Sequence, residues 1–243
     1  MPDSVLDIRG LVLMRPGAGA SRYAFVVPAL SLRRGARYSL FGPSGSGKST
    51  ALDLMSMILK PNRADLFVLH TGSGAIDAAA AWRTGSIDAL ARARSESLGY
   101  VLQTGGLMPF LSVRDNILLP RAIKGLPGDG PLEELSEHLG IAHLLKKPAG
   151  SVSVGERQRT GIARALIHEP ELVLADEPTA ALDPYTADDV MRLLVALSEA
   201  RGVTLLVASH DWDRMRAWKF TELRIDVQRR ENATVAELVA PAS

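Results

Sequence analysis

The chain has 243 residues, of which 47% are hydrophobic and 23% are charged, and it contains no cysteine. This composition excludes an intrinsically disordered or collagen-like chain, and the lack of cysteine excludes disulfide bonds, cysteine-based zinc sites and a catalytic thiol. Lysine and arginine number 28 against 27 acidic residues, and the net charge of +1 argues against a nucleic-acid partner.

The pattern of apolar residues predicts an α/β core that is interrupted by a mostly helical insertion. In chain order we expect strands at 5–13 and 23–32 joined by a glycine-rich loop at 16–20, a strand at 37–41, an apolar helical run at 51–59, an alanine-rich helical stretch at 74–98, a stretch rich in glycine and proline at 104–131, a helix at 132–147 and further strands at 172–175 and 203–208. No internal repeat is visible, so we expect one such unit.

No segment approaches the roughly 18 consecutive apolar residues that are needed to span a bilayer. The N-terminus shows no charged start followed by an apolar stretch of signal-peptide length. We therefore expect a cytoplasmic chain that works at a membrane only through a partner.

A phosphate-binding loop follows the strand at 37–41. The segment fits G-x-x-x-x-G-K-[ST], in which glycines let backbone N–H groups surround phosphates and the next helix presents its positive end. Lys48 is expected to reach the β- and γ-phosphates and Ser49 to ligate Mg²⁺. A glycine- and serine-rich linker could match by chance, but the flanking strand and helix argue against it. The expected ATP-binding residues are Gly42, Pro43, Ser44, Gly45, Ser46, Gly47, Lys48, Ser49 and Thr50.

An apolar strand beginning at residue 171 ends in the carboxylates Asp176 and Glu177. A buried strand that delivers an aspartate beside a phosphate loop is a usual way to hold Mg²⁺, so Asp176 is expected to bind the metal through water. Glu177 is placed to orient or deprotonate the attacking water. A solvated Asp-Glu pair that closes a strand is the alternative, and the phosphate loop favours the catalytic interpretation.

Between these motifs, Ser153 is predicted to cap a helix, with Glu156 at the capping-box position. Here the chain resembles the ATP-binding cassette family. The family signature, Leu-Ser-Gly-Gly-Gln/Glu, is similar to Val152–Glu156, and arginine and glutamine follow it in both. The resemblance implies that Ser153, Gly155 and Glu156 contact ATP that is bound to a second cassette.

Further family motifs follow in the family order. Gln103 resembles the glutamine of a loop that touches Mg²⁺ and ATP and senses the transmembrane subunit. Asp183, in Ala181-Leu182-Asp183, resembles the loop that crosses the dimer interface. His210 resembles the switch histidine that contacts the γ-phosphate and acts in catalysis. The resemblance covers roughly residues 5–225.

Two positions depart from the family pattern. Val154 stands where the signature has its first glycine, so a β-branched side chain replaces a close backbone approach to phosphate. We expect slower hydrolysis without its loss. The aromatic residue that usually stacks on adenine is also missing near Arg15. Either Arg15, through its planar guanidinium, or Tyr23 is left to take that role.

The resemblance implies an α/β fold with a phosphate-loop (RecA-like) ATP-binding cassette core, an N-terminal antiparallel β subdomain and an inserted helical subdomain. The core is expected at 1–103 and 168–243, and the helical subdomain with the signature at 104–167. Two copies would sandwich two ATP molecules with Mg²⁺, and closure of this dimer would drive transmembrane permease subunits. The expected location is the cytoplasmic face of the inner membrane.

Residues 99–120 are similar to cassettes of the lipoprotein-releasing and macrolide-efflux class, whereas residues 62–98 are longer than that class predicts and contain Trp82. The chain also looks like cassettes linked to threonine-phosphorylation control of type VI secretion. The alternatives are a soluble cassette ATPase of translation or DNA repair and a weakly catalytic cassette with a structural or regulatory role. Glu177 and His210 argue against the last alternative.

Overall fold

The computed structural model describes residues 3–16, 22–230 and 233–240, so residues 17–20 of the expected connecting loop lie outside the described part. The chain forms two units, one of residues 1–94 with 206–243 and the other of residues 95–205. Buried apolar side chains lie in both units. Of the helices in the described ranges, none combines the length and the apolar character that crossing a bilayer requires.

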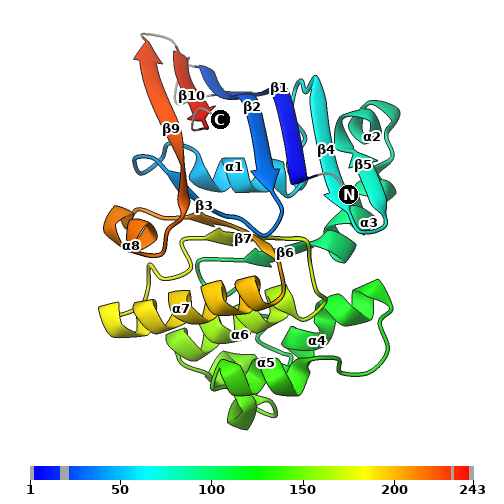
Figure 1. Ribbon diagram of the computed structural model, residues 1–243, viewed down its shortest axis with the longest axis vertical. Coiled ribbons are helices and arrows are strands. Elements are labelled where there is room, and N and C mark those ends of the chain that lie inside the picture. The colour runs from blue at the N-terminus through cyan, green and yellow to red at the C-terminus, as the bar shows by residue number, and fades with distance from the viewer. Residues whose placement is uncertain (1–2, 17–21, 231–232, 241–243) are drawn as a thin grey trace. The chain divides into compact units, whose positions relative to one another are not determined.

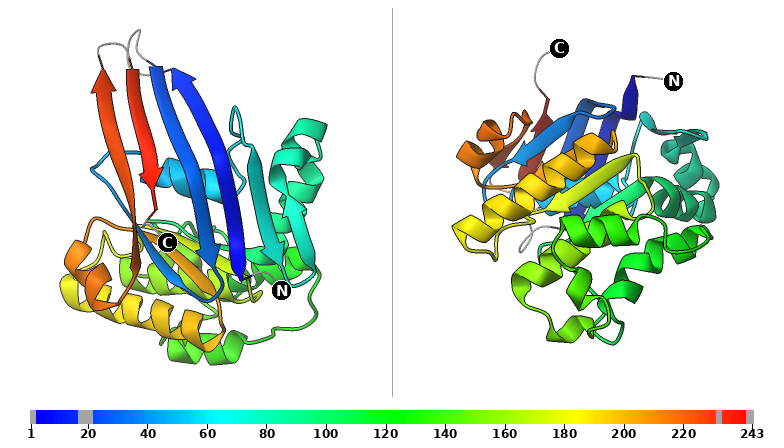
Figure 2. Two further views of the ribbon diagram at one scale, coloured as in Figure 1. Left: turned by 45° about the horizontal axis from the view of Figure 1, so that its top comes forward. Right: turned by 60° about the horizontal axis from the view of Figure 1, so that its bottom comes forward.

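The first unit is built on a large sheet. Its elements are β1 (Ser4–Pro16), β2 (Arg22–Arg33), β3 (Arg37–Phe41), α1 (Lys48–Met55), β4 (Leu66–Thr71), β5 (Gly74–Asp77), α2 (Ala78–Thr84), most of α3 (Ile87–Ser97), the end of β8 (Thr204–Ala208), α8 (Trp212–Ala217), β9 (Thr221–Arg230) and β10 (Ala233–Val239). The strand order within this unit is β5-β4-β1-β2-β10-β9-β3, and Figure 2 shows the long strands side by side.

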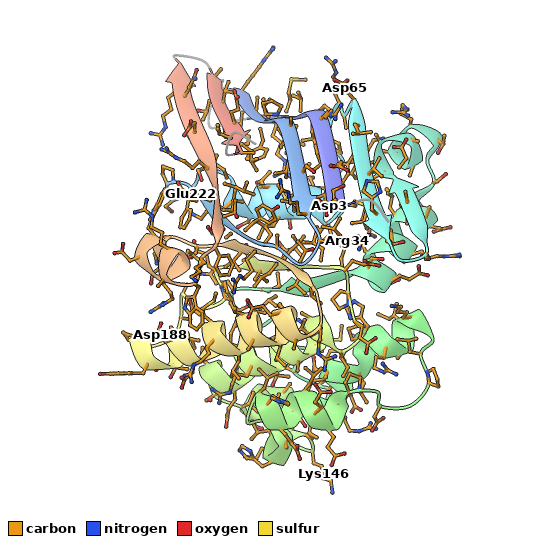
Figure 3. The ribbon with its side chains drawn as sticks, in the orientation of Figure 1. Asp3, Arg34, Asp65, Lys146, Asp188 and Glu222 are labelled. Carbon is orange, nitrogen blue, oxygen red and sulfur yellow. The ribbon has the colours of Figure 1, made fainter. Side chains whose placement is uncertain are left out.

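The hairpin of β1 and β2 confirms the two expected N-terminal strands. The strands are antiparallel, and apolar residues such as Phe25 alternate toward the buried face. At one end of the hairpin the Arg34 N–H donates to the carbonyl of Asp3 at 3.0 Å, and Figure 3 labels both residues there. The third expected strand is β3, which pairs in parallel with β9.

Strands β9 and β10 were not expected from the sequence. β10 lies between β2 and β9, parallel to the first and antiparallel to the second. Its position therefore depends on a partner more than 200 residues away in the chain. Alternation of apolar residues at Leu223 and Ile225 with charged residues was the signal that could have revealed β9.

The stretch 74–98 is not one helical segment, which corrects the prediction. It begins with β5, which pairs with β4, and continues with α2 and α3. Asp77 caps α2 by accepting a hydrogen bond from the Ala80 N–H at 2.8 Å, and Gly85, at φ 73°, ends it. Trp82 is buried against Phe67 with ring centroids 5.3 Å apart, so α2 covers β4 (Figure 1).

Helix α1 is shorter than the predicted run at 51–59. It starts three residues earlier, at the end of the phosphate loop, and ends at Met55 with Ser56 as C-cap. Met57 then takes a left-handed backbone conformation at φ 59°, and its side chain is buried. The chain therefore turns at Met57, and Pro61 disfavours helical backbone at Lys60.

The second unit is mostly helical. It contains the end of α3, β6 (Leu98–Val101), α4 (Val113–Lys124), α5 (Leu132–His138), two short 3₁₀ segments (Ala142–Leu144 and Ala149–Ser151), α6 (Val154–Leu166), β7 (Leu172–Asp176), α7 (Pro184–Ala200) and the start of β8. β6 and β7 pair in parallel. Helix α6 packs against α4, α5, α7 and β6, and so forms the centre of this unit (Figure 1).

Two helices of this unit correct the sequence analysis. Helix α4 lies inside the stretch rich in glycine and proline. Ser112 caps it and Pro120 is accommodated in its third turn. The helix predicted at 132–147 ends at His138 because Gly140 takes φ 65° and reverses the chain. The strands expected at 172–175 and 203–208 are present as β7 and β8.

His168 is a buried titratable residue between α6 and β7. Its Nε2 hydrogen-bonds to the Leu98 carbonyl at 3.0 Å, while its Nδ1 finds no partner among the described residues. Burial lowers the pKa of His168 from 6.5 to about 4, while the Leu98 bond raises it and the nearby positive charges of Lys124 and Arg121 lower it. The folded chain therefore keeps this imidazole neutral.

We expect the free energy of unfolding to decrease as the pH falls below 6.5. Above that pH His168 is neutral in both states, whereas below it the unfolded chain takes up a proton that the folded chain binds only near pH 4. The full difference is about 3 kcal/mol. Urea unfolding at pH 7.5 and 4.5 should show a smaller acid loss for His168→Gln than for the wild type. Equal losses would contradict this assignment.

Candidate functional site

The phosphate loop joins β3 to α1 in the first unit. Gly45 and Gly47 have φ values of 74° and 101°, which L side chains rarely adopt. Gly47 is also the N-cap of α1, and no side chain caps the first-turn N–H groups of the helix. A methyl group on Gly47 would lie 2.4 Å from the Tyr23 hydroxyl oxygen. The loop is thus a backbone cradle with a helix N-terminus, which suits an anion.

Lys48 lies at this cradle. Its side chain is buried, and its Nζ donates to the carbonyl of Gly42 at 3.0 Å and approaches that of Pro43 at 3.5 Å. The ammonium group of Lys48 therefore lies against the backbone of the loop that would surround a bound phosphate. The Oγ of Ser46 is buried with no hydrogen-bond partner among the described residues. The backbone N–H of Ser46 donates to the Pro43 carbonyl.

His210 lies beside the start of the phosphate loop. The Ser209 N–H donates to the Leu40 carbonyl of β3 at 3.3 Å, and Trp212 stacks on Phe41 with ring centroids 4.0 Å apart. The residues before and after His210 are therefore both held against the strand that leads into the loop. His210 itself is exposed. This unit thus brings together the expected phosphate loop and the expected switch histidine.

Tyr23 touches the phosphate loop from β2. Its hydroxyl donates to the Ser46 carbonyl at 3.3 Å, and burial raises its pKa despite the nearby positive charge of Arg15. Arg15 is the cross-strand neighbour of Tyr23 and is exposed. The Tyr23 hydroxyl is thus hydrogen-bonded to the loop. Of the two side chains expected to stack on adenine, Arg15 is the more accessible.

In the second unit, the residues expected to bind Mg²⁺, Gln103 and Asp176, follow two strands that pair in parallel. Val101 of β6 lies opposite Ala175 of β7. Gln103 and Asp176 follow these residues closely, so both emerge at the carboxyl end of the two strands. Gln103 is exposed and Asp176 is half-buried.

Glu177 has an unusual backbone. Its φ is 43°, a left-handed conformation that is uncommon for a residue other than glycine. Its carbonyl accepts a hydrogen bond from the Ala180 N–H at 3.1 Å, which closes the turn after β7. Strain of this kind is typical of functional positions, because the surrounding structure must maintain it.

The capping box predicted at the start of α6 is confirmed. The Ser153 Oγ accepts a hydrogen bond from the Glu156 N–H at 3.3 Å, and the Ser153 N–H donates to the Glu156 carboxylate at 2.8 Å. These bonds lower the pKa of Glu156. Val154 is 52% exposed and projects into solvent at the first position of the helix.

Asp183 and the signature lie side by side. A methyl group on Gly155 would lie 3.2 Å from the Cγ2 of Thr186 in the first turn of α7. Asp183 is the N-cap of α7 and accepts hydrogen bonds from the N–H groups of Tyr185 and Thr186, both at 3.1 Å. Hydrogen bonding with Thr186 lowers the pKa of Asp183. The second unit thus joins the signature to the expected interface loop.

Two residues hold the loop that contains Gln103. The sequence analysis noted Gln158 only as part of the run after the signature, and it missed Arg164. Gln158 Nε2 donates to the Leu102 carbonyl, and Arg164 donates to the carbonyls of Gly105 and Gly106. An arginine in an amphipathic helix normally lies on the solvated face. No local pattern therefore distinguished Arg164 from an ordinary surface residue.

Comparison with known proteins gives the family. The family model "ABC transporter" matches residues 28–180. The chain belongs to the ABC transporter family. The cassette is similar to the lipoprotein-releasing system ATP-binding protein LolD of Paramagnetospirillum magneticum, at 37% identity over 187 residues that cover 76% of this chain and 79% of the relative. It is also 39% identical to the uncharacterized ABC transporter ATP-binding protein YvcR of Bacillus subtilis over 185 residues, which cover 75% of this chain and 68% of the relative.

A solved structure agrees in fold. The cassette matches MJ0796 of Methanocaldococcus jannaschii, solved as a dimer in a post-hydrolysis state bound to ADP and Pi, with a TM-score of 0.74, 27% identity and coverage of 90% of this chain and 93% of that chain. The expected α/β cassette fold is confirmed. As a family member with this fold, the cassette is an ATPase of the class that includes the lipoprotein-releasing relatives.

Proposed function

We propose that two copies of this cassette close around two molecules of ATP and thereby drive a conformational change in a membrane permease. The core would comprise 1–103 and 168–243, and the helical subdomain 104–167. The dimeric state of MJ0796 supports the pairing of two copies. The cassette would act at the cytoplasmic face of the inner membrane, where the permease would hold it.

Nucleotide binding is assigned to the phosphate loop, residues 42–50. Its backbone N–H groups would surround the phosphates, and Lys48 would exchange its loop carbonyls for β- and γ-phosphate oxygens. The hydroxyl, amide and carboxylate oxygens of Ser49, Gln103 and Asp176 are the donor types that suit Mg²⁺. Bound there, Mg²⁺ would neutralise charge on the phosphates.

Hydrolysis is assigned to Glu177 and His210. The carboxylate of Glu177 would accept a proton from the attacking water and orient it, and its left-handed backbone holds this group in a defined direction. His210, fixed through Ser209 and Trp212 to the strand before the phosphate loop, would donate a hydrogen bond to the γ-phosphate.

The signature residues Ser153, Gly155 and Glu156 are assigned to the ATP of the partner copy. The N-terminus of α6 carries a partial positive charge, which favours a bound phosphate. Asp183 would contribute to the same dimer interface, because its helix N-terminus adjoins Gly155. Val154 projects into solvent at this surface, so its side chain would meet the partner copy on closure.

Coupling to a permease rests on one observation. Leu102, Met108 and Phe110 are 43%, 39% and 81% exposed, and they flank Gln103 in the second unit. Large apolar side chains gathered on a surface mark a site for a partner. A permease segment that covers them would sense any movement of the glutamine loop. The names of the lipoprotein-releasing relatives support a permease of that class.

We expect Phe110→Glu to abolish stable association with the permease and to leave the ATPase rate of the isolated cassette within about twofold, because the change buries a charge in the complex only. The cassette would be co-expressed with a candidate permease and purified through a tag on the permease. Ile123→Glu, at the far end of α4, is the matched control, since Ile123 is 64% exposed. Normal co-purification of Phe110→Glu would refute this docking surface.

A further inference from the structure

One face of α6 holds the glutamine loop, which is defined here as residues 102–106. Three carbonyls of this loop accept hydrogen bonds from the helix. The Nε2 of Gln158 donates to the Leu102 carbonyl at 3.3 Å, and the two terminal nitrogens of Arg164 donate to the carbonyls of Gly105 and Gly106, both at 2.8 Å. One planar guanidinium therefore spans two successive peptide units.

The loop can present both carbonyls because of its glycines. Gly105 and Gly106 have φ values of 74° and 55°, which direct the backbone toward α6. The two backbones also approach closely. A methyl group on Gly105 would lie 2.9 Å from the Arg157 carbonyl oxygen, and one on Gly161 would lie 3.2 Å from the Gly105 carbonyl oxygen. The backbone of the loop at Gly105 is thus packed directly on the backbone of the helix.

The Arg164 contact is a strong one by its chemistry. Hydrogen bonds from a charged donor are shorter and stronger than neutral ones, and a guanidinium can make two of them in a fixed geometry. Arg164 is half-buried, and burial lowers its pKa. Because the guanidinium has lost part of its hydration, it depends on its bonds to Gly105 and Gly106 to satisfy its N–H groups.

The same helix begins at the signature. Ser153 is its N-cap and Arg164 lies in its last turn, so about 16 Å of continuous helix separates the two residues. Because a hydrogen-bonded α-helix has a fixed rise per residue, its two ends are held at a set separation. A shift of the glutamine loop would therefore reach the signature directly.

We propose that Arg164 is a positioning residue that fixes the glutamine loop to the signature helix, so that Gln103 and Ser153 move as one body when ATP binds. This inference rests on the roles proposed above for Gln103 and Ser153. Arg164 itself touches neither ATP nor Mg²⁺ in this proposal.

The test compares Arg164→Lys with Arg121→Lys. Lysine retains the charge but cannot donate to two carbonyls in the geometry of a guanidinium. Arg121 is the matched control, because its guanidinium also donates to backbone carbonyls, those of Pro127 and Ile167, which lie outside the glutamine loop. Steady-state Mg-ATPase kinetics should show kcat reduced about tenfold in Arg164→Lys and KM within about threefold, because the phosphate loop is unchanged. Arg121→Lys should retain the wild-type kcat.

Hydrogen exchange measures the coupling itself. In the Glu177→Gln background, ATP should protect residues 102–106 and 152–156 together. Adding Arg164→Lys should reduce the protection of the first segment at least fivefold while the second remains protected, and adding Arg121→Lys should change neither. Should Arg164→Lys fail to fold, Gly161→Ala keeps the arginine and displaces the Gly105 carbonyl, and it should separate the two segments in the same way.

Two failures can be told apart. If ATP protects neither segment in Glu177→Gln, the proposed nucleotide roles of Gln103 and Ser153 are wrong. If ATP protects both segments and Arg164→Lys leaves kcat and both protections unchanged, Arg164 does not couple the two elements and the inference is overturned.

Discussion

Replacing Glu177 with glutamine is expected to lower the steady-state ATPase rate at least on the order of a hundredfold and to trap a dimer of two cassettes around ATP. Glutamine has the shape of glutamate but cannot accept the proton of the attacking water, and loss of a general base typically costs a factor of this size. The phosphate and Mg²⁺ contacts assigned to Lys48 and Asp176 remain, so ATP still binds. A cassette that binds ATP without hydrolysing it should remain closed with its partner.

The measurement is gel filtration with light scattering, with and without Mg-ATP, together with a phosphate-release assay. Without nucleotide we expect a monomer, because the surfaces around the phosphate loop and the signature are polar. Glu137→Gln, an exposed carboxamide substitution on α5, is the control and should hydrolyse ATP at the wild-type rate. Hydrolysis by Glu177→Gln at the wild-type rate would show that another group acts as the base.

Replacing Gly47 with alanine should reduce ATP affinity at least on the order of a hundredfold, equivalent to about 3 kcal/mol. The new methyl group would lie 2.4 Å from the Tyr23 hydroxyl and 3.1 Å from Cδ2 of Phe25, and the backbone φ of 101° is itself unfavourable for alanine. Phe25 is fully buried and cannot move aside. The loop must therefore change conformation, and its N–H groups would no longer converge on the phosphates.

Gly45→Ala is the matched control. Gly45 also has a positive φ, 74°, but no described residue other than its chain neighbours has an atom within 4 Å of an added methyl group. The Gly45→Ala variant should therefore lose about 1 kcal/mol through its backbone conformation alone, without a steric clash. Its affinity for ATP should fall much less than that of Gly47→Ala. Titration calorimetry with ATP and melting curves on the three proteins make the comparison. Equal losses for the two variants would mean that backbone conformation alone, not the contact with Tyr23, governs the loop.

The capping box and the glycine-rich loop could be predicted from the sequence because short-range chemistry defines them. The capping box of Ser153 and Glu156 requires only two groups three residues apart, and the structure contains both of its hydrogen bonds. The positive φ of Gly47 likewise follows from a turn that no other residue adopts easily. The strands β1, β2, β3 and β7 were predicted for a similar reason, since β1 and β2 alternate between the two faces and β3 and β7 are short, mostly apolar runs bounded by turn residues.

Where local patterns conflicted with long-range packing, the prediction was wrong. The stretch 74–98 has the composition of a helix, yet its first four residues form β5, because β4 offers them a strand to pair with. Helix α4 forms in spite of Pro120, since Ser112 caps it and α6 packs against it. Trp82, which stood out as unexplained, is a core residue of α2 that packs against Phe67.

The sequence by itself therefore determined the family, the motifs and the residue types of the nucleotide site, all of which depend on neighbours within a few positions. Tertiary structure alone decided that the Tyr23 hydroxyl bonds to the phosphate loop, that Ser209, next to His210, bonds to β3, and that Arg164 holds the glutamine loop. Each of these contacts joins residues that are more than 20 positions apart, and a single tyrosine, serine or arginine carries no local sign of the backbone group that it will meet.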